Sequence, residues 1–440
     1  MENPDLSKIN ISDISNVRKV FFVGIGGIGI SAIARMMFLE GKEVSGSDMS
    51  DSGVITELQN LGIHITIGQG FELIPKDVDL IVYTIAIPHY DPKLFEQIKN
   101  SGTLSKSYPE MLHYVTSNKY TIAVSGTHGK TTTTAMIGKV LIDAKLDPSM
   151  IVGSILKEYK SNLVVGKGEH FVVEACEYER SFLNINPTIL VITNIEEDHL
   201  DYYKDLADIQ NAFSQMIKQT KSYVICNPKD LPTGSTYENL EIVDYTKYLE
   251  YVPKLSVPGE HNRMNAACAL AVAEILKISQ EQARTSLTSF QGTWRRLEKK
   301  GVTKEGAIVY DDYAHHPTEV RASLAGLREL YPDKKITVLF QPHLYSRTKA
   351  LFDEFVTCFR GADQIYLLPI YFARELPDPE VSSEKLAMAM SKQGVKVEAF
   401  SDFTSAEEAI QALFLKDNDV FVTMGAGEAY KVADKVFKLV

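Results

Sequence analysis

The segment Tyr120–Thr132, YTIAVSGTHGKTT, contains an apolar run, a glycine-rich turn and the beginning of a helical pattern. Such a strand, loop and helix predict a backbone cradle for phosphates, although two residues separate Gly126 from Gly129 instead of the usual four. Lys130 is placed to reach terminal phosphates, and the Thr131 hydroxyl to bind Mg²⁺. An ordinary turn, the alternative, would leave Lys130 without an anion to bind. We therefore assign to ATP the residues Gly126, Thr127, His128, Gly129, Lys130, Thr131 and Thr132.

A second glycine-rich turn, Val23–Gly29 (VGIGGIG), also follows an apolar run and precedes a helical pattern. Its glycines fit the G-x-G-x-x-G spacing, which lets a diphosphate approach the backbone at a helix N-terminus. Asp48 lies 19 residues beyond Gly29, at the end of the next predicted strand, where it can accept a hydrogen bond from a ribose or base. A glycine-rich packing turn is the alternative. We assign to a nucleotide-linked substrate the residues Gly26, Gly27, Ile28, Gly29, Ser47 and Asp48.

Apolar runs recur along the whole chain, with helical patterns such as Ala266–Ile278 between them. The runs span residues 20–25, 80–85, 120–126, 171–175, 189–194, 222–226, 307–313, 336–340, 364–369 and 419–425. This alternation predicts parallel sheets covered on both faces, with ligands beyond the carboxyl ends of the strands.

We expect an α/β protein of three domains. These are a Rossmann-like N-terminal domain (1–118), a central P-loop ATPase-type parallel-sheet domain (119–296) and a C-terminal Rossmann-like α/β domain (297–440). The polar stretch 298–306 (EKKGVTKEG) is interpreted as a lead into the first strand of the last domain.

Composition restricts the function classes. The chain has 440 residues and a net charge of −11, which argues against nucleic acid as the main partner. Its four cysteines are far apart and form no CxxC pair, so we expect a reducing, cytoplasmic environment without disulfides or a zinc site. The first residues are polar and acidic, unlike a signal peptide, and we find no candidate membrane span. Oligomeric state is left open.

Two further strand ends carry candidate metal ligands. Glu174 ends the apolar run that begins at Phe171, and His199 follows the run Ile189–Thr193. An acid at a strand end beside a phosphate loop commonly organises Mg²⁺. We therefore expect a metal set of Thr131, Glu174 and His199; a surface acid and a structural histidine are the alternatives.

With these residues in view, the chain resembles the Mur ligase family over essentially its whole length. The matching blocks are FVGIGGIGISAIA, SGTHGKTTT, TNIEEDHLDYY, GEHNRMNAACA, GTWRRLE, DDYAHHPTEV, FQPHLYSRT and MGAGE. The resemblance implies domains for a UDP-linked substrate, for ATP and for an amino acid. It implies ATP-dependent joining of L-alanine to the carboxylate of UDP-N-acetylmuramate through an acyl phosphate, in peptidoglycan biosynthesis, with Mg²⁺.

The resemblance also implies roles for residues that spacing alone does not assign. His261, Asn262 and Asn265 match the block that contacts the adenine side of ATP. Arg295 and Arg296 match arginines at the junction to the last domain. Positions around the muramyl carboxylate and the incoming amino acid are matched by Tyr313, His315, His316, His343 and Arg347. The expected catalytic set is Lys130, Glu174, His199, Arg295, His316 and Arg347, with Tyr313 and His316 on the amino acid and His343 and Arg347 on the UDP substrate. One histidine of the pair 315/316 is expected to be structural, and the sequence does not decide which.

Two positions depart from the family pattern. Cys176 stands where the family usually has an aspartate, and we interpret it as a small buried residue instead of a reactive thiol. Trp294 precedes the arginine pair where smaller residues are common, and we expect it to pack at the domain hinge.

Three alternative functions are weighed. The first is a ligase of the same fold that attaches a tripeptide to UDP-N-acetylmuramate. The second is an NAD-dependent oxidoreductase, which accounts for Val23–Gly29 and Asp48 but leaves the phosphate loop at Gly126–Lys130 unexplained. The third is a non-catalytic nucleotide sensor or scaffold, which leaves Glu174 and His199 unexplained.

Overall fold

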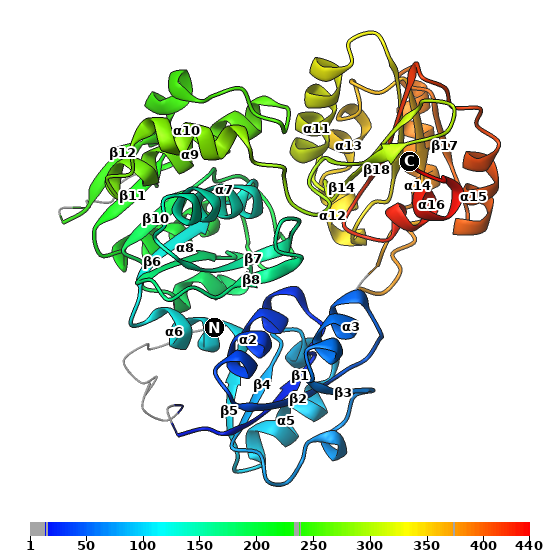
Figure 1. Cartoon of the computed structure of the whole chain (residues 1–440). Coiled ribbons are helices and arrows are strands. Elements are labelled where there is room, and N and C mark those ends of the chain that lie inside the picture. Colours follow the sequence, from blue (N-terminus) through cyan, green and yellow to red (C-terminus); the bar gives the residue numbers. More distant parts are fainter. Residues whose placement is uncertain (1–13, 15, 233–236, 238, 373–374) are drawn as a thin grey trace. The chain divides into compact units, whose positions relative to one another are not determined.

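The computed structural model describes residues 14, 16–232, 237, 239–372 and 375–440 (Figure 1). The N-terminal stretch 1–13, on which the signal-peptide argument depends, lies outside these residues. The chain forms two compact units. The first contains the residues up to Ile195, Ile209–Lys247 and Cys268–Ala283, and the second contains Glu196–Asp208, Tyr248–Ala267 and Arg284–Val440.

The first unit contains a five-stranded parallel sheet in the order β3-β2-β1-β4-β5. The strands are β1 (Lys19–Val23), β2 (Glu43–Asp48), β3 (His64–Ile67), β4 (Leu80–Tyr83) and β5 (Leu104–Ser107). The helices are α2 (Ile28–Leu39), α3 (Gly53–Asn60), α4 (Ile87–Tyr90), α5 (Pro92–Asn100) and α6 (Tyr108–Thr116). Side chains from α4 and α5 pack against alternate residues of β1 and β4, while α2 contacts α3 and α6. Because both faces are covered, the central strands are apolar throughout.

The same unit contains a seven-stranded sheet in the order β12-β11-β10-β6-β9-β7-β8. Its strands are β6 (Tyr120–Ser125), β7 (Ser149–Leu156), β8 (Ser161–Val164), β9 (His170–Glu174), β10 (Ile189–Ile192), β11 (Tyr223–Cys226) and β12 (Glu241–Asp244). All neighbours are parallel except β7 and β8, which form an antiparallel edge. Helix α7 (Lys130–Asp143) contacts β6, β7 and β9, and α8 (Leu206–Lys218) follows β10 in the chain. The phosphate loop thus lies at the carboxyl end of a central strand, where ligands bind in such sheets.

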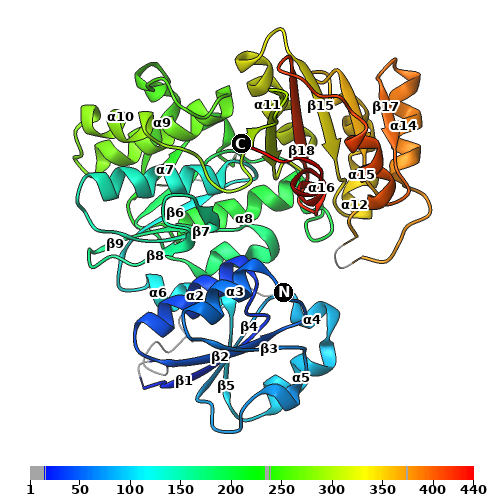
Figure 2. The same cartoon turned by 45° about the vertical axis from the view of Figure 1, so that its right-hand side comes forward.

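The second unit contains a six-stranded sheet in the order β13-β14-β18-β15-β16-β17. Its strands are β13 (Glu298–Val302), β14 (Ile308–Asp312), β15 (Lys335–Phe340), β16 (Gln364–Leu367), β17 (Val397–Ala399) and β18 (Asp419–Met424). Its helices are α11 (Pro317–Leu330), α12 (Tyr345–Ala350), α13 (Phe352–Thr357), α14 (Ser383–Lys392), α15 (Phe403–Gln411) and α16 (Ala429–Val436). Alternate residues of β18 face opposite sides: Val420 and Val422 pack with α11, α13 and α14, and Phe421 packs with α15 and α16. Figure 2 shows the labelled helices α11, α14, α15 and α16 around this sheet.

The chain between the two sheet regions forms α9 (Glu260–Ile275) and α10 (Gln280–Thr288). The 3₁₀ segments are η2 (Phe71–Leu73), η3 (Tyr178–Asn184), η4 (Pro228–Asp230) and η5 (Tyr245–Tyr251). Within the part of the chain that the structure describes, none of the helices combines the length and the apolar character that crossing a membrane requires.

Each predicted apolar run overlaps a strand, so the expected α/β fold with three mainly parallel sheets is confirmed. Residues 298–306 were expected to be a polar connection before the first strand of the last domain. This prediction was incomplete, because Glu298–Val302 forms strand β13, which pairs antiparallel with β14. An edge strand has only one neighbour and keeps charged side chains in water, so it lacks the apolar signature of a central strand. The helix expected from Ala266 begins earlier, at Glu260, and ends at Ile275. The boundaries 118/119 and 296/297 stay a prediction.

Candidate active site

The phosphate loop between β6 and α7 depends on its glycines. Gly126 has a φ of 133° and Gly129, the N-cap of α7, has a φ of 83°, both in the region that favours glycine. A β-carbon at Gly126 would collide with the Thr193 side chain. Asn194 supports the loop, because its carbonyl accepts from Thr127 N at 3.1 Å and its side-chain oxygen accepts from His128 N at 2.9 Å. The structure thus brings the predicted loop together and adds Asn194 as a support.

Lys130 reaches back over this loop. Its Nζ donates to the carbonyl of Gly126 at 2.5 Å, to that of Thr127 at 2.9 Å and to Glu177 Oε1 at 3.0 Å. Burial by itself would lower the pKa of Lys130, but the carboxylates of Glu177 and Glu174 outweigh it and raise this pKa. Lys130 is therefore a permanently charged ammonium above the loop, as phosphate binding requires.

Glu177 is the partner that sequence reasoning missed. Its side chain is 3% exposed and its Oε2 lies 2.9 Å from Lys130 Nζ. A buried carboxylate needs a positive partner, and Lys130 supplies it. Its position three residues after Glu174, in the turn that follows β9, was the available signal.

The Glu174 carboxylate and the Thr131 hydroxyl meet at the end of β9. Thr131 Oγ1 donates to Glu174 Oε1 at 3.0 Å, and the amide of Gly153 donates to Glu174 Oε2 at 2.7 Å. Hydroxyl and carboxylate oxygens are ligands that Mg²⁺ prefers, so these two residues fit the predicted ion. Among the described residues no group of three or more His, Cys, Asp or Glu side chains is gathered as a metal site. His199 belongs to the second unit, so the structure gives a geometry for the Thr131–Glu174 pair alone.

Cys176 is exposed, and the expectation of a buried residue was wrong. Its neighbours Ala175 and Glu177 turn inward in this segment, so the Cys176 side chain faces outward. The surrounding protein still desolvates the thiol, and together with the charge of Glu177 it raises the pKa of Cys176 to about 12. A thiol at neutral pH is a poor nucleophile, which agrees with an inert residue.

The glycine-rich turn of the first sheet is tied to the end of β2. The amides of Gly24 and Ile25 donate to the Ser47 carbonyl at 2.8 and 3.1 Å, and Gly26 N donates to Asp48 Oδ2 at 2.9 Å. The N-cap of α2, Gly27, has no side-chain cap, and the first turn of this helix has no acidic residue. The first turn of α2 therefore offers its amides to an anion. The structure gathers the six predicted residues, but Asp48 also holds the loop.

The residues expected on the adenine side of ATP lie at the start of α9 in the second unit. Asn262 Nδ2 donates to the Pro258 carbonyl at 2.7 Å, and Asn265 Nδ2 donates to Asn262 Oδ1 at 3.3 Å. Burial lowers the pKa of His261 to about 4, so its imidazole is neutral. The two asparagines are thus on one helical face and partly used in holding each other.

The adjacent arginines have different surroundings. Arg295 is 4% exposed, and its guanidinium donates to Asp311 Oδ2 at 2.8 Å and to the carbonyls of Gly427 and Gly425 at 3.1 and 2.7 Å. Arg296 is 27% exposed and lies 3.7 Å from Glu319. Because the donors of Arg295 bind the protein itself, the geometry favours Arg296 over the predicted Arg295 for contact with a ligand. The Trp294 ring packs on Tyr430 at 6.3 Å; its expected place at a hinge stays a prediction.

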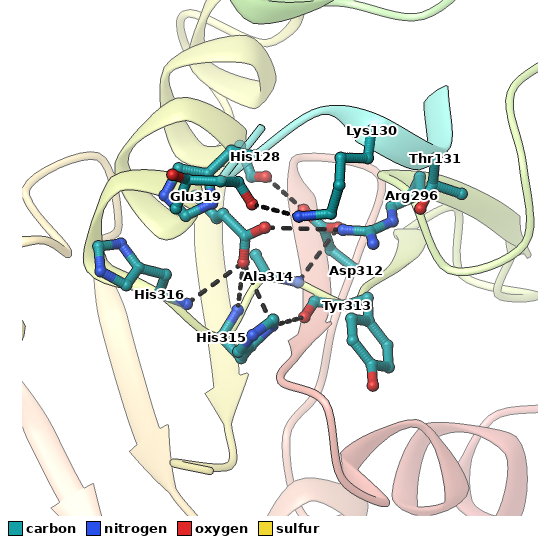
Figure 3. Close-up of polar contacts among 12 residues, drawn as sticks. His128, Lys130, Thr131, Arg296, Asp312, Tyr313, Ala314, His315, His316 and Glu319 are labelled. Atoms are coloured by element: carbon teal, nitrogen blue, oxygen red, sulfur yellow. Dashed lines mark hydrogen bonds and ion pairs between the residues drawn. The ribbon is translucent and has the colours of Figure 1, made fainter. Parts of the chain in front are cut away.

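The two adjacent histidines also differ, and Figure 3 shows both beside Glu319. His316 is 3% exposed and caps α11, because its Nδ1 accepts from Thr318 N at 3.3 Å while Glu319 accepts from the His316 amide. The His315 Nδ1 lies 3.0 Å from the Tyr313 carbonyl and 3.2 Å from Glu319. Both neighbours are acceptors, so Nδ1 carries the proton and Nε2 of His315 is an acceptor. Burial lowers the pKa of His315 to about 4, which keeps the ring neutral.

Arg347 and His343 complete this cluster. Arg347 donates twice to Asp198 Oδ1, at 3.3 and 2.9 Å, and its Nη1 lies 3.1 Å from His343 Nδ1. The His343 ring packs against His315 at 5.8 Å and stacks on Tyr371 at 5.6 Å. Burial opposes it, but the charges of His199 and Arg347 hold the pKa of Asp198 well below its usual range. Sequence reasoning missed Asp198 and Tyr371; the position of Asp198 next to His199 was a signal for the first.

The comparisons with known proteins agree with these motifs. Residues 19–120 match the model of the Mur ligase family catalytic domain, 124–246 the Mur ligase middle domain, and 295–427 the Mur ligase glutamate ligase domain. The chain is 39% identical to the UDP-N-acetylmuramate–L-alanine ligase of Clostridium acetobutylicum over 96% of its own length and 98% of the relative. The corresponding values for the enzyme of Clostridium tetani are 38%, 96% and 98%.

Solved structures give the same grouping. The UDP-N-acetylmuramate–alanine ligase of Thermotoga maritima aligns with a TM-score of 0.79 at 26% identity, covering 95% of this chain and 98% of that one. A murein peptide ligase of Psychrobacter arcticus aligns with a TM-score of 0.70 at 21% identity over 95% and 98%, which shows the shared fold. Three matching domains in order, and relatives that span nearly the whole chain, show that this protein belongs to the Mur ligase family.

Proposed function

We propose that the chain joins L-alanine to the carboxylate of UDP-N-acetylmuramate and converts ATP to ADP and phosphate. The observation that carries this proposal is the 39% identity, over 96% of the chain, to a ligase named for this reaction. The two phosphate-binding loops of the first unit support it, because a ligase of this kind must hold a triphosphate and a nucleotide-linked acid. We place the reaction in peptidoglycan biosynthesis, in the cytoplasm.

In the first step the muramyl carboxylate attacks the γ-phosphorus of ATP, and ADP leaves. Two unit charges 4 Å apart repel by about 4 kcal/mol at an effective dielectric of about 20. Lys130 lowers this cost as a fixed ammonium, and Arg296 is the second candidate cation. Mg²⁺, when bound at Thr131 and Glu174, would supply further positive charge for the phosphates.

In the second step the amine of L-alanine attacks the carbonyl carbon of the acyl phosphate, and phosphate leaves. The ammonium group of L-alanine must lose one proton before its nitrogen can attack, and a second proton leaves as the amide forms. His315 suits this stage, because its neutral ring presents Nε2 as an acceptor. We therefore assign amino-acid binding to Tyr313 and His315, and give His316 the role of a helix cap.

The acceptor is tested by ADP release with UDP-N-acetylmuramate and a panel of L-alanine, glycine, L-serine and the tripeptide of the recycling ligases. Release with L-alanine alone, or at far lower concentration than with the others, is expected. Preference for the tripeptide would replace L-alanine by that acceptor.

The route is tested by placing oxygen-18 in the substrate carboxylate. Through an acyl phosphate, one labelled oxygen is transferred to inorganic phosphate. Phosphate without the label would contradict the route while leaving the overall reaction intact.

We also propose the domain division 1–118, 119–296 and 297–440. The family domains at 19–120, 124–246 and 295–427 support it. Limited proteolysis that cuts near residues 118 and 296 would agree with it.

A further inference from the structure

Tyr108 is the first residue of α6, directly after β5, and has no role in the assignments above. The N-terminus of α6 is occupied, because Ser107 and Glu110 form a capping box. The contribution of this position to a ligand site is therefore its side chain.

The Tyr108 ring lies against Gly29, the third glycine of the loop at the start of α2. A β-carbon built on Gly29 would come within 2.5 Å of the ring and 2.6 Å of the phenol oxygen. Gly29 has no positive φ, so close approach of this ring is the reason that only a hydrogen fits there. The hydroxyl thus lies directly above the first turn of α2, whose backbone amides are available to bind an anion.

The same phenol is close to the phosphate-loop acid of the neighbouring sheet. Burial and the charge of Glu174 raise the pKa of Tyr108, so the hydroxyl stays protonated and can only donate to an anion. Among the residues that the structure describes, no partner hydrogen bond is found for this hydroxyl. The Tyr108 side chain is partly exposed, so this donor, beside the free amides of α2, is accessible to a ligand.

Asn162 of β8 holds the two regions together inside the first unit. Its Nδ2 donates to the Ile28 carbonyl and, at 2.9 Å, to Ser31 Oγ, both in the first turns of α2. The helix that faces the diphosphate is therefore attached to the sheet that carries Glu174.

From this arrangement we propose that the Tyr108 hydroxyl donates a hydrogen bond to the diphosphate of the UDP-linked substrate, beside the amides of α2. Tyr108 is then a binding residue that positions the substrate between the glycine loop and the phosphate-loop acid. The inference rests on the proposed function for the identity of the nucleotide.

The test is Tyr108→Phe, which removes the oxygen and keeps the ring on Gly29. We expect the Kd for UDP, measured by calorimetry, to rise about tenfold, which corresponds to about 1.4 kcal/mol. The KM for UDP-N-acetylmuramate should rise by the same factor, while the kcat and the KM for ATP stay unchanged. The reason is that the lost hydrogen bond stabilises the bound substrate and the transition state equally. Tyr114→Phe on the same helix is the matched control and should change none of these values.

Unchanged UDP affinity in Tyr108→Phe would overturn the proposal, as would an equal rise in the KM for ATP. Tyr108→Leu provides a second measurement if the phenylalanine variant is unstable, and the same loss of UDP affinity is expected. UDP binding is measured without turnover, so the affinity test does not depend on ligation. If the wild-type chain failed to ligate L-alanine, the proposed reaction would be rejected, but the comparison of UDP affinities would remain valid. Normal ligation with unchanged UDP affinity in the variant would reject only the role of Tyr108.

Discussion

Asp312 at the end of β14 is a buried carboxyl whose replacement should stabilise the protein. Its side chain accepts hydrogen bonds from Ser323 Oγ and from the Ala314 amide, and it is 4% exposed. In Asp312→Asn the amide oxygen can keep the Ala314 bond, and the NH₂ group can donate to Ser323 Oγ. The substitution therefore removes the charge and keeps these two hydrogen bonds.

The magnitude follows from the pKa. Burial, opposed by the Ser323 hydrogen bond and the charge of Arg296, raises the pKa of Asp312 from 3.8 to about 6. Each pKa unit corresponds to about 1.4 kcal/mol, so the charged form costs about 3 kcal/mol in the folded state. Between about pH 4 and pH 6 the folded protein holds a proton that the unfolded chain has released, so stability falls as pH rises through this window. Asp312→Asn should match the wild type near pH 4 and exceed it by up to about 3 kcal/mol above pH 6.

The measurement is urea unfolding at several pH values, followed by tryptophan fluorescence. The chain has one tryptophan, and Trp294 packs on Tyr430 within the second unit, so its emission reports on the unit that contains Asp312. The matched control is Asp311→Asn, one residue away. Burial raises the pKa of Asp311 as well, but Asp311 pairs with buried Arg295 at 2.8 Å, and loss of one partner leaves the other charge buried, which costs about 3–5 kcal/mol and decides the sign. The two neighbouring substitutions should thus have opposite signs at neutral pH.

The reasoning would be refuted if Asp312→Asn were less stable than the wild type at pH 7, or if the difference between them did not change between pH 4 and pH 7. The first result would mean that the carboxylate is better solvated by its neighbours than its burial indicates. The second would mean that Asp312 titrates alike in both states.

Four further substitutions test the site. Lys130→Ala should lower the ligation rate by about 100- to 1000-fold, since it removes a fixed charge at the transferring phosphoryl group, and should leave calorimetric UDP affinity intact; equal loss of both would mean that the loops are assigned to the wrong ligands. His315→Ala should raise the KM for L-alanine with little change in the free energy of unfolding, whereas His316→Ala should lower that free energy by about 1 kcal/mol, because α11 loses its N-cap. If kinetic and urea measurements showed the two effects reversed, His316 would be the ligand residue. Glu177→Gln should weaken ATP binding in a titration, because Lys130 loses the partner that holds it over the loop; unchanged affinity would show that the two carbonyl acceptors suffice.

Sequence reasoning was accurate where the signal is local. The apolar runs at β6, β10, β14 and β18 contain their own strands, because strands buried on both faces carry no polar positions. The phosphate loop was predictable for a similar reason, since a tight turn before a helix restricts Gly126 and Gly129 through their own φ angles. The sequence did not reveal edge strand β13, because a strand with one neighbouring strand and a solvent-exposed face does not require apolar residues.

The amino-acid sequence alone therefore determined the α/β fold, the two glycine-rich loops and the family. Tertiary structure decided which member of each adjacent pair is buried with its donors or acceptors used by the protein and which stays more exposed: Arg295 against Arg296, and His316 against His315. It also revealed Glu177 as the partner of Lys130. The physical reason is that the backbone conformation depends mainly on neighbouring residues in the sequence, whereas the burial and the partners of a side chain depend on segments that are distant in the sequence.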